Sequence, residues 1–243
     1  MPTSILARMP RWSLAALLAA GLAGAMWSMQ GHSAERATVI PPPAADAVES
    51  TGETQTVVLA GGCFWGVQAV FQHVKGVTKA VSGYAGGAKD TARYNVVSSG
   101  TTGHAESVQI TYDPRQISYG RILQIYFSVA HNPTELNYQG PDVGTQYRSA
   151  IFFADDDQKK VATAYIDQIE KAHVFSRPIV TRLEPLHGFY PAEEHHQDFA
   201  VLHPSYPYIV FNDLPKVENL KKLFAADYRD KPVTVMASSK AGE

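Results

Sequence analysis

The stretch that decides the fold is Thr56-Val57-Val58-Leu59-Ala60-Gly61-Gly62-Cys63-Phe64-Trp65-Gly66. Its first five residues form an apolar run as long as a short buried strand, and the glycine pair that follows is typical of a tight turn. Apolar side chains then recur at helical spacing from Val67 to Val74, and Gly76 marks the end of that helix. The sequence therefore predicts a strand, a turn and a helix, with Cys63 where the helix starts.

Strands and helices continue to alternate after this stretch. Two strands follow one another without an intervening helix, so we expect a mixed sheet. The predicted fold is an α/β (α+β) two-layer sandwich with a ferredoxin-like β-α-β-β-α-β core and helices packed on it. The further strands are predicted at Thr78 to Tyr84, Ser107 to Tyr112, Tyr147 to Phe153 and Pro178 to Leu183. The further helices are predicted from Ser118 to before Pro133, from Asp155 past Ile169, near Ala192 to Leu202 and near Lys216 to Phe224.

Residues 1–34 have the layout of a secretory signal. Arg8 and Arg11 precede an uncharged apolar run from Leu14 to Met29. The run is slightly short for a membrane span, which takes about 20 apolar residues. Cleavage after residue 34 would put His32 where a small residue is preferred, so a cleaved signal peptide and an uncleaved membrane anchor both stay open.

The remainder of the chain divides into three parts. Residues 35–54, with Pro41-Pro42-Pro43, have little apolar periodicity and are expected to be a flexible linker. Residues 55–230 are the predicted folded domain, and residues 231–243 are predicted to be a disordered tail. The whole chain of 243 residues is 45% hydrophobic and 18% charged, which is typical of a globular protein. Its formal net charge of −2 argues against nucleic acid as a partner.

Cys63 is the single cysteine of the sequence. An intramolecular disulfide is thereby excluded, and so is a zinc site built from cysteines. A lone cysteine is often a buried small hydrophobe, but Cys63 stands at a helix N terminus, between glycines and beside two large aromatic residues. Unpaired N–H groups and a partial positive charge at such a terminus favour a thiolate, so the sequence predicts a lowered thiol pKa and a nucleophilic role.

Three further motifs stand in the same domain as Gly61-Gly62-Cys63-Phe64-Trp65-Gly66. They are Gly103-His104-Ala105-Glu106, Gly144-Thr145-Gln146-Tyr147-Arg148-Ser149 and Phe189-Tyr190-Pro191-Ala192-Glu193-Glu194-His195-His196-Gln197. In these motifs and in their order, the chain from Thr56 to Tyr228 resembles the peptide methionine sulfoxide reductase A family. One short motif alone would be weak, whereas several in register are not a coincidence.

The resemblance implies a reaction and the residues that perform it. In that family a cysteine thiolate attacks the sulfoxide sulfur of methionine sulfoxide, methionine leaves, and a sulfenic acid remains on the cysteine. The S epimer, free or in a peptide, is the expected substrate. Cys63 matches the nucleophile, Glu106 the acid, and Tyr94 and Tyr147 the two hydrogen-bond donors to the sulfoxide oxygen. To donate a proton near neutral pH, Glu106 needs a raised pKa.

The resemblance also implies a substrate pocket. Phe64 and Trp65 match the aromatic walls around the ε-methyl group of the substrate, and Asp142 and His196 match further pocket-lining positions. Taken one at a time, each of these residues has an ordinary structural role open to it, as a core aromatic, a turn residue or a surface histidine.

The sequence departs from the family in its cysteines. Many members resolve the sulfenic acid with a second cysteine, but Ser98 stands where some relatives have one, and the block from Pro207 to Asp213 resembles the branch that lacks them in its tail. Phe199, where some relatives have tyrosine, and His195 are smaller departures. An external thiol, either a thioredoxin-fold protein or a small thiol, must therefore reduce the sulfenic acid, and no other cofactor or metal is expected.

Export follows from the N-terminal segment. We expect the protein in the bacterial periplasm, soluble after cleavage or anchored to the inner membrane, as a monomer that repairs oxidised proteins or free methionine sulfoxide with a periplasmic thioredoxin-fold donor. Two rival functions stay open. A cysteine hydrolase would pair Cys63 with His196, although the order Gly-Cys-x-x-Gly differs from a nucleophile elbow. A module binding oxidised peptides or a metal would use the nine histidines, but no His-Glu-x-x-His pattern occurs.

Overall fold

The computed structural model describes residues 37–46, 52 and 54–236. The predicted signal peptide or anchor at 1–34 and the end of the predicted tail at 237–243 lie outside the described residues. No helix in the described part of the chain combines the length and the apolar character that a membrane span needs.

The described residues form a mixed sheet of six strands in the spatial order β7-β6-β1-β3-β2-β8. β6 and β7 pair in parallel, and the other neighbours are antiparallel. The α/β class and the mixed sheet predicted from the sequence are confirmed. The strands of this sheet are β1 (Gln55–Ala60), β2 (Val77–Ala85), β3 (Ala105–Tyr112), β6 (Ala150–Phe153), β7 (Arg182–Pro185) and β8 (Phe189–Pro191), while β4 (Tyr138–Gln139) and β5 (Asp142–Val143) form a separate ribbon.

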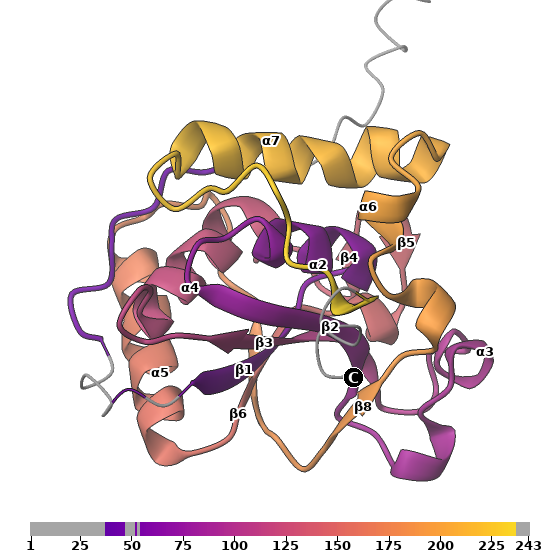
Figure 1. The fold of residues 1–243 in the computed structure, drawn as a ribbon. Coiled ribbons are helices and arrows are strands. Elements are labelled where there is room, and N and C mark those ends of the chain that lie inside the picture. Colours follow the sequence, from indigo (N-terminus) through magenta and orange to yellow (C-terminus); the bar gives the residue numbers. More distant parts are fainter. Residues whose placement is uncertain (1–36, 47–51, 53, 237–243) are drawn as a thin grey trace, which may run out of the picture. The chain divides into compact units, whose positions relative to one another are not determined.

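Helices pack against the sheet, with α2 on β2 and β3 and α7 over α2 (Figure 1). Two of them begin where the sequence predicts. Ser118 accepts a hydrogen bond from the Arg121 N–H at the start of α4, and Asp155 caps α5 through the Gln158 N–H. The α-helices of the described residues are α2 (Phe64–Gln72), α3 (Tyr94–Val97), α4 (Tyr119–Ile125), α5 (Asp156–Lys171), α6 (Phe199–Leu202) and α7 (Leu214–Leu223).

Side chains alternate between two apolar clusters along β1. Val57 and Leu59 join the large core that includes residues of α2, α4, α5 and α7. Val58 and Ala60 belong to a smaller cluster, against which Phe189 also packs. Because successive side chains of a strand point to opposite faces, Val57 and Leu59 lie on the face of the sheet that the helices cover.

The largest differences from the sequence prediction lie at three elements. The predicted helix from Ala192 to Leu202 is interrupted, because Asp198 between the turn at Glu194–His196 and α6 has a left-handed backbone with φ of 57°. Its carboxylate accepts a hydrogen bond from Gln72 Nε2 at 2.6 Å. β6 begins at Ala150, and Tyr147 instead ends a single turn of 3₁₀ helix. β7 begins four residues later than the start predicted at 178.

Residues 37–46 lie along the domain, where the sequence predicts a flexible tether. Ile40 is buried, and its carbonyl oxygen accepts from Gln124 Nε2 at 2.6 Å. Thr38 N–H donates to the Ser128 carbonyl oxygen, and Asp46 Oδ1 accepts from the Gly120 N–H. The three prolines remove N–H donors from this segment but leave its carbonyl oxygens, and that of Pro41 accepts a hydrogen bond from the Tyr165 hydroxyl of α5 at 2.8 Å. These hydrogen bonds and the buried Ile40 side chain hold the segment on α4 and α5.

Part of the predicted tail is also held. The N–H groups of Val235 and Met236 donate to the two carboxylate oxygens of Asp198 at 3.0 and 3.1 Å. Val233 N–H donates to the Gln72 carbonyl oxygen at the end of α2. The last described residues therefore lie beside the helix that Cys63 precedes.

Candidate active site

Cys63 is the residue that precedes α2, and it is 9% exposed. The turn before it needs glycine at position 62, because Gly62 has φ of 88° and a Cβ there would lie 2.6 Å from Gln139 Cβ. Strand β1, this turn and α2 thus place the thiol at a helix N terminus, as the sequence predicts.

Glu106 approaches the same helix end from the neighbouring strand. It lies on β3 opposite Tyr84 of β2 and is 3% exposed. Its Oε2 accepts a hydrogen bond from the Phe64 N–H at 3.1 Å, one residue after Cys63. Burial raises the pKa of Glu106 to about 8, and the charges of Asp142 and Asp213 act in the same direction. The carboxyl group therefore holds a proton at neutral pH, as the sequence requires of an acid.

The thiol itself does not have the lowered pKa that its helix position predicts. Burial raises the pKa of Cys63 well above the ordinary value, and the charges of Glu106 and Asp213 raise it further. The backbone N–H of Trp65 acts in the opposite direction and is outweighed. That prediction was wrong, because the helix N terminus lies in a buried pocket lined by carboxyl groups, which the local sequence does not reveal.

Tyr94 and Tyr147 come from two short helical segments far apart in the chain. Tyr94 begins α3 and is 37% exposed, while Tyr147 is half-buried at the end of its 3₁₀ turn. Burial is the largest cause of the raised pKa of each hydroxyl, and the charges of Glu106 and Cys63 contribute to both. Because Glu106 and Cys63 affect the pKa of both tyrosines, the four predicted catalytic residues lie close together. Both phenols are protonated and can donate hydrogen bonds.

The two aromatic residues after Cys63 differ in exposure. Phe64 is 1% exposed and packs against Tyr84 and His196, with ring centroids 5.9 and 5.2 Å away. Trp65 is half-buried and stacks on Phe199 with centroids 3.9 Å apart. Trp65 therefore offers accessible apolar surface, whereas Phe64 is part of the buried core.

Asp142 and His196 also lie in this group. Asp142 on β5 is half-buried, accepts a hydrogen bond from the Tyr208 hydroxyl, and is one of the charges that raise the pKa of Cys63. His196 is 4% exposed, and its ring lies 4.4 Å from that of Tyr94. Burial lowers the pKa of His196, so the ring is neutral at pH 7. The other seven residues singled out from the sequence thus lie in one group with Cys63.

Two residues of the site were not singled out from the sequence. Tyr208 reaches Asp142, and the charge of Cys63 contributes to its raised pKa. Asp213 is fully buried, and its Oδ1 lies so close to Gly66 of α2 that a Cβ there would be 2.1 Å away. The Lys216 ammonium lies 3.7 Å from the same carboxylate. The Pro207 to Asp213 block was visible in the sequence, but nothing local indicates that it returns to α2.

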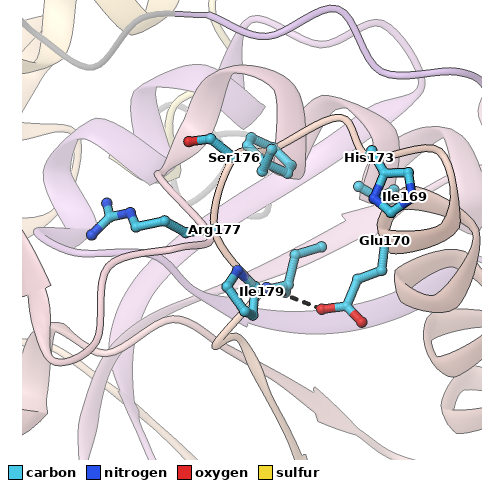
Figure 2. Close-up of a pocket in the computed structure, with 8 residues that line it drawn as sticks. Ile169, Glu170, His173, Ser176, Arg177 and Ile179 are labelled. Carbon is cyan, nitrogen blue, oxygen red and sulfur yellow. Dashed lines mark hydrogen bonds between the residues drawn. The ribbon is translucent and has the colours of Figure 1, made fainter.

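A further pocket in the described part of the chain lies away from this group. Figure 2 shows a pocket at the end of α5, and none of its lining residues belongs to the group around Cys63. Glu170 in this pocket accepts a hydrogen bond from the Ile179 N–H. Among the described residues, no cluster of histidine, cysteine and carboxylate side chains is arranged to hold a metal ion.

A thiol beside a protonated carboxyl group and phenol donors can take an oxygen from a soft atom and supply the proton that the oxygen needs. The fold and the site therefore define a thiol-dependent oxidoreductase. The model of the family described as peptide methionine sulfoxide reductase matches residues 55–228.

Individual proteins agree with this family match. The chain is 65% identical to peptide methionine sulfoxide reductase MsrA 2 of Mesorhizobium japonicum, over 76% of this chain and 95% of that protein. It is 50% identical to MsrA 2 of Synechocystis, over 77% of this chain and 89% of that protein. The crystal structure of reduced Mxr1 from Saccharomyces cerevisiae is 31% identical, covers 66% of this chain and 91% of that chain, and superposes with a TM-score of 0.57.

The chain belongs to the peptide methionine sulfoxide reductase family, in its A branch. Its activity is that of a peptide-methionine (S)-S-oxide reductase, which returns methionine sulfoxide to methionine.

Proposed function

We propose that Cys63 is the nucleophile of this reduction, with Glu106 as its acid and Tyr94 and Tyr147 as donors to the sulfoxide oxygen. The observation that supports this most is the buried Glu106 carboxyl group bonded to the Phe64 N–H, because it puts a proton-carrying group next to the thiol. Trp65 and Phe64 form the apolar wall of the pocket for the substrate methyl group. Asp142 and His196 line the other parts of the same substrate pocket.

The first half of the reaction transfers one oxygen. Cys63 Sγ attacks the sulfoxide sulfur and forms a sulfur–sulfur bond to it. The sulfur–oxygen bond of the substrate then breaks, the protonated oxygen bonds to Sγ as the hydroxyl of a sulfenic acid, and the sulfur–sulfur bond breaks so that methionine leaves. The sulfoxide is reduced by two electrons and Cys63 is oxidised by two. Glu106 protonates the departing oxygen, and the proton lost by the thiol returns the carboxyl group to its neutral state.

The second half needs two thiols from outside the chain, because Cys63 is the single cysteine. The first thiol attacks the sulfenic sulfur, forms a mixed disulfide and releases water. The second thiol releases Cys63 and leaves the donor oxidised to a disulfide. A thioredoxin-fold protein is the proposed donor, and a small thiol is the alternative.

The proposed setting is the bacterial periplasm. The support is the N-terminal sequence alone, where Arg8 and Arg11 precede the apolar run of residues 14–29. A periplasmic donor and oxidised periplasmic proteins would then be the partners of a monomeric enzyme. Fractionation of cells that produce the full chain checks this proposal, since recovery in the cytoplasm alone would contradict it.

A ferredoxin-like core, with helices on one face of the sheet as the second layer, is our finer description of the fold. Its support is the chain order β1, α2, β2, β3, α4, β6 together with the spatial order β6-β1-β3-β2. In this arrangement Cys63 follows the first core strand and Glu106 lies on the third, which is adjacent to the first.

The experiment that tests the catalytic proposal uses the separate epimers of N-acetyl-methionine sulfoxide with dithiothreitol. The wild type should consume the S epimer and spare the R epimer, and Cys63→Ser should consume neither while its circular dichroism stays that of the wild type. Loss of dithiothreitol in proportion to methionine formed distinguishes reduction from hydrolysis. Activity in the folded Cys63→Ser variant would refute the assignment of the nucleophile.

A further inference from the structure

Glu193 joins three parts of the molecule through one carboxylate. Its Oε2 accepts a hydrogen bond from the Tyr84 hydroxyl at 2.9 Å, and its Oε1 accepts one from the Tyr94 N–H at 2.9 Å. Tyr84 lies on β2 opposite Glu106, whereas Glu193 itself follows β8 and precedes the turn that contains His196. Glu193, which has no role in the proposed reaction, therefore links the sheet to helix α3, which carries the proposed donor Tyr94.

Tyr94 needs such a link because its own element is weak. Helix α3 has four residues, which is too short to be stable by itself. Arg93 precedes it without a side-chain hydrogen bond to the helix end, and Tyr94 is more than a third exposed. The Glu193 carboxylate acts in place of the missing N-cap, but from a residue nearly 100 positions later in the chain.

The ring of Tyr94 is placed by the same segment. It lies 4.4 Å from the ring of His196, three residues after Glu193. The hydrogen bond from Glu193 holds the backbone of Tyr94, and the contact with His196 holds its ring. The position of the Tyr94 hydroxyl group is set by both. A hydrogen-bond donor contributes to catalysis only when it is held at the position where charge develops.

We infer that Glu193 is a positioning residue, which holds Tyr94 so that its hydroxyl group is directed at the sulfoxide oxygen. This inference rests on the donor role proposed for Tyr94. Glu193 does not touch the reacting atoms, and it acts through the backbone of the residue that does.

The charge of Glu193 suits this task. Burial by itself would raise the pKa of this carboxyl group, but the N–H groups of Tyr94 and Glu193 and the Tyr84 hydroxyl outweigh burial and hold the pKa below its usual value. The groups that face it are thus two backbone N–H groups, one phenol and His196, which also lowers its pKa. Glu193 remains an acceptor of two hydrogen bonds throughout the neutral pH range.

A double-mutant cycle between Glu193→Ala and Tyr94→Phe tests the inference, with the single-turnover rate of methionine formation as its readout. Glu193→Ala should lower this rate about tenfold with little change in KM, because misplacing a donor costs transition-state binding more than substrate binding. Glu193→Gln keeps an acceptor for the Tyr94 N–H and should restore most of the rate. Glu194→Ala is the matched control, because this neighbouring side chain is exposed and its loss should leave the rate unchanged.

In the Tyr94→Phe background, Glu193→Ala should have no further effect, since the hydroxyl group that it positions is gone. Equal fold losses in both backgrounds would overturn the inference and leave Glu193 a structural residue. If Tyr94→Phe alone has the wild-type rate, Tyr94 is not a donor, and the inference about Glu193 fails because its premise is wrong. This outcome differs from equal fold losses in both backgrounds, which would refute the positioning role itself. Should Glu193→Ala not fold, Glu193→Asp, whose carboxylate is one methylene shorter, takes its place in the cycle.

Discussion

Glu106 is an ordinary carboxylate in the sequence and a buried carboxyl group with a raised pKa in the fold. On β3, Glu106 points to the same face of the sheet as Val108 and Ile110, which is the face covered by the helices. The residues between them point to the opposite face. A shift of one residue in the register of β3 would turn Glu106 away from Cys63. The residue type was recognisable from the sequence motif, but the raised pKa depends on burial by α2.

The raised pKa of Glu106 predicts a change of stability with pH. Between the ordinary pKa of about 4.5 and the native value of about 8, the folded state binds the proton more tightly than the unfolded state, so this group stabilises the fold below pH 4.5 and loses that contribution as pH rises to 8. Glu106→Gln cannot ionise. From pH 5 to pH 8, its free energy of unfolding relative to the wild type should rise by on the order of 3 kcal/mol in urea titrations. A constant difference across this range would show that Glu106 is ionised in the native protein.

Asp213 should control the ionisation of the thiol. Its charge is among the causes that raise the pKa of Cys63, so Asp213→Asn should lower that pKa and speed alkylation of Cys63 by iodoacetamide at pH 8 several-fold. The variant should also lose about 1 to 3 kcal/mol of stability, because Lys216 keeps a buried charge without its partner. Asp230→Asn, at an exposed carboxylate, is the control and should alkylate at the wild-type rate. An unchanged thiol pKa in folded Asp213→Asn would contradict this role.

Helix α2 connects the thiol to the C-terminal part of the domain. Its Gly66 contacts the Asp213 carboxylate, and its Gln72 reaches Asp198 at the interruption before α6. The strand, turn and helix around Cys63 are local, and their apolar periodicity and glycines predict them well. The interruption at Asp198 is not local, since long-range hydrogen bonds to α2 hold its backbone in the left-handed region.

Gly66→Ala should destabilise the protein although alanine favours helices over glycine by about 1 kcal/mol. The added Cβ would lie 2.1 Å from Asp213 Oδ1 and 2.8 Å from its Cγ, so the buried carboxylate would have to move. We expect a net loss of about 1 to 3 kcal/mol in urea unfolding. Gly66→Ala with Asp213→Ala removes the contact and should be more stable than the sum of the two single changes indicates. A single Gly66→Ala variant more stable than the wild type would contradict the contact.

At the scale of the whole molecule, residues 37–46 extend the domain beyond its N-terminal strand. Ile40→Ala should cost about 2 kcal/mol, because it removes a buried side chain from the core near the carbonyl that Gln124 binds. Val39 beside it is 77% exposed, so Val39→Ala is a matched control and should change stability by less than about 0.5 kcal/mol. Urea unfolding of the two variants checks the prediction, and equal stabilities would mean that this segment does not contribute to the fold.

The sequence by itself determined the α/β class, the mixed sheet, the position of Cys63 at the start of a helix and the membership of the family. The fold class follows from the spacing of apolar residues, and the place of Cys63 follows from the turn at Gly62, which has no room for a side chain. The family follows from several motifs in a set order. Only the tertiary structure decided the direction of the thiol pKa, the return of Asp213 and Tyr208 to α2, and the link from Glu193 to Tyr94. Burial and the approach of charges from distant segments set these properties, and neither is a local quantity of the chain.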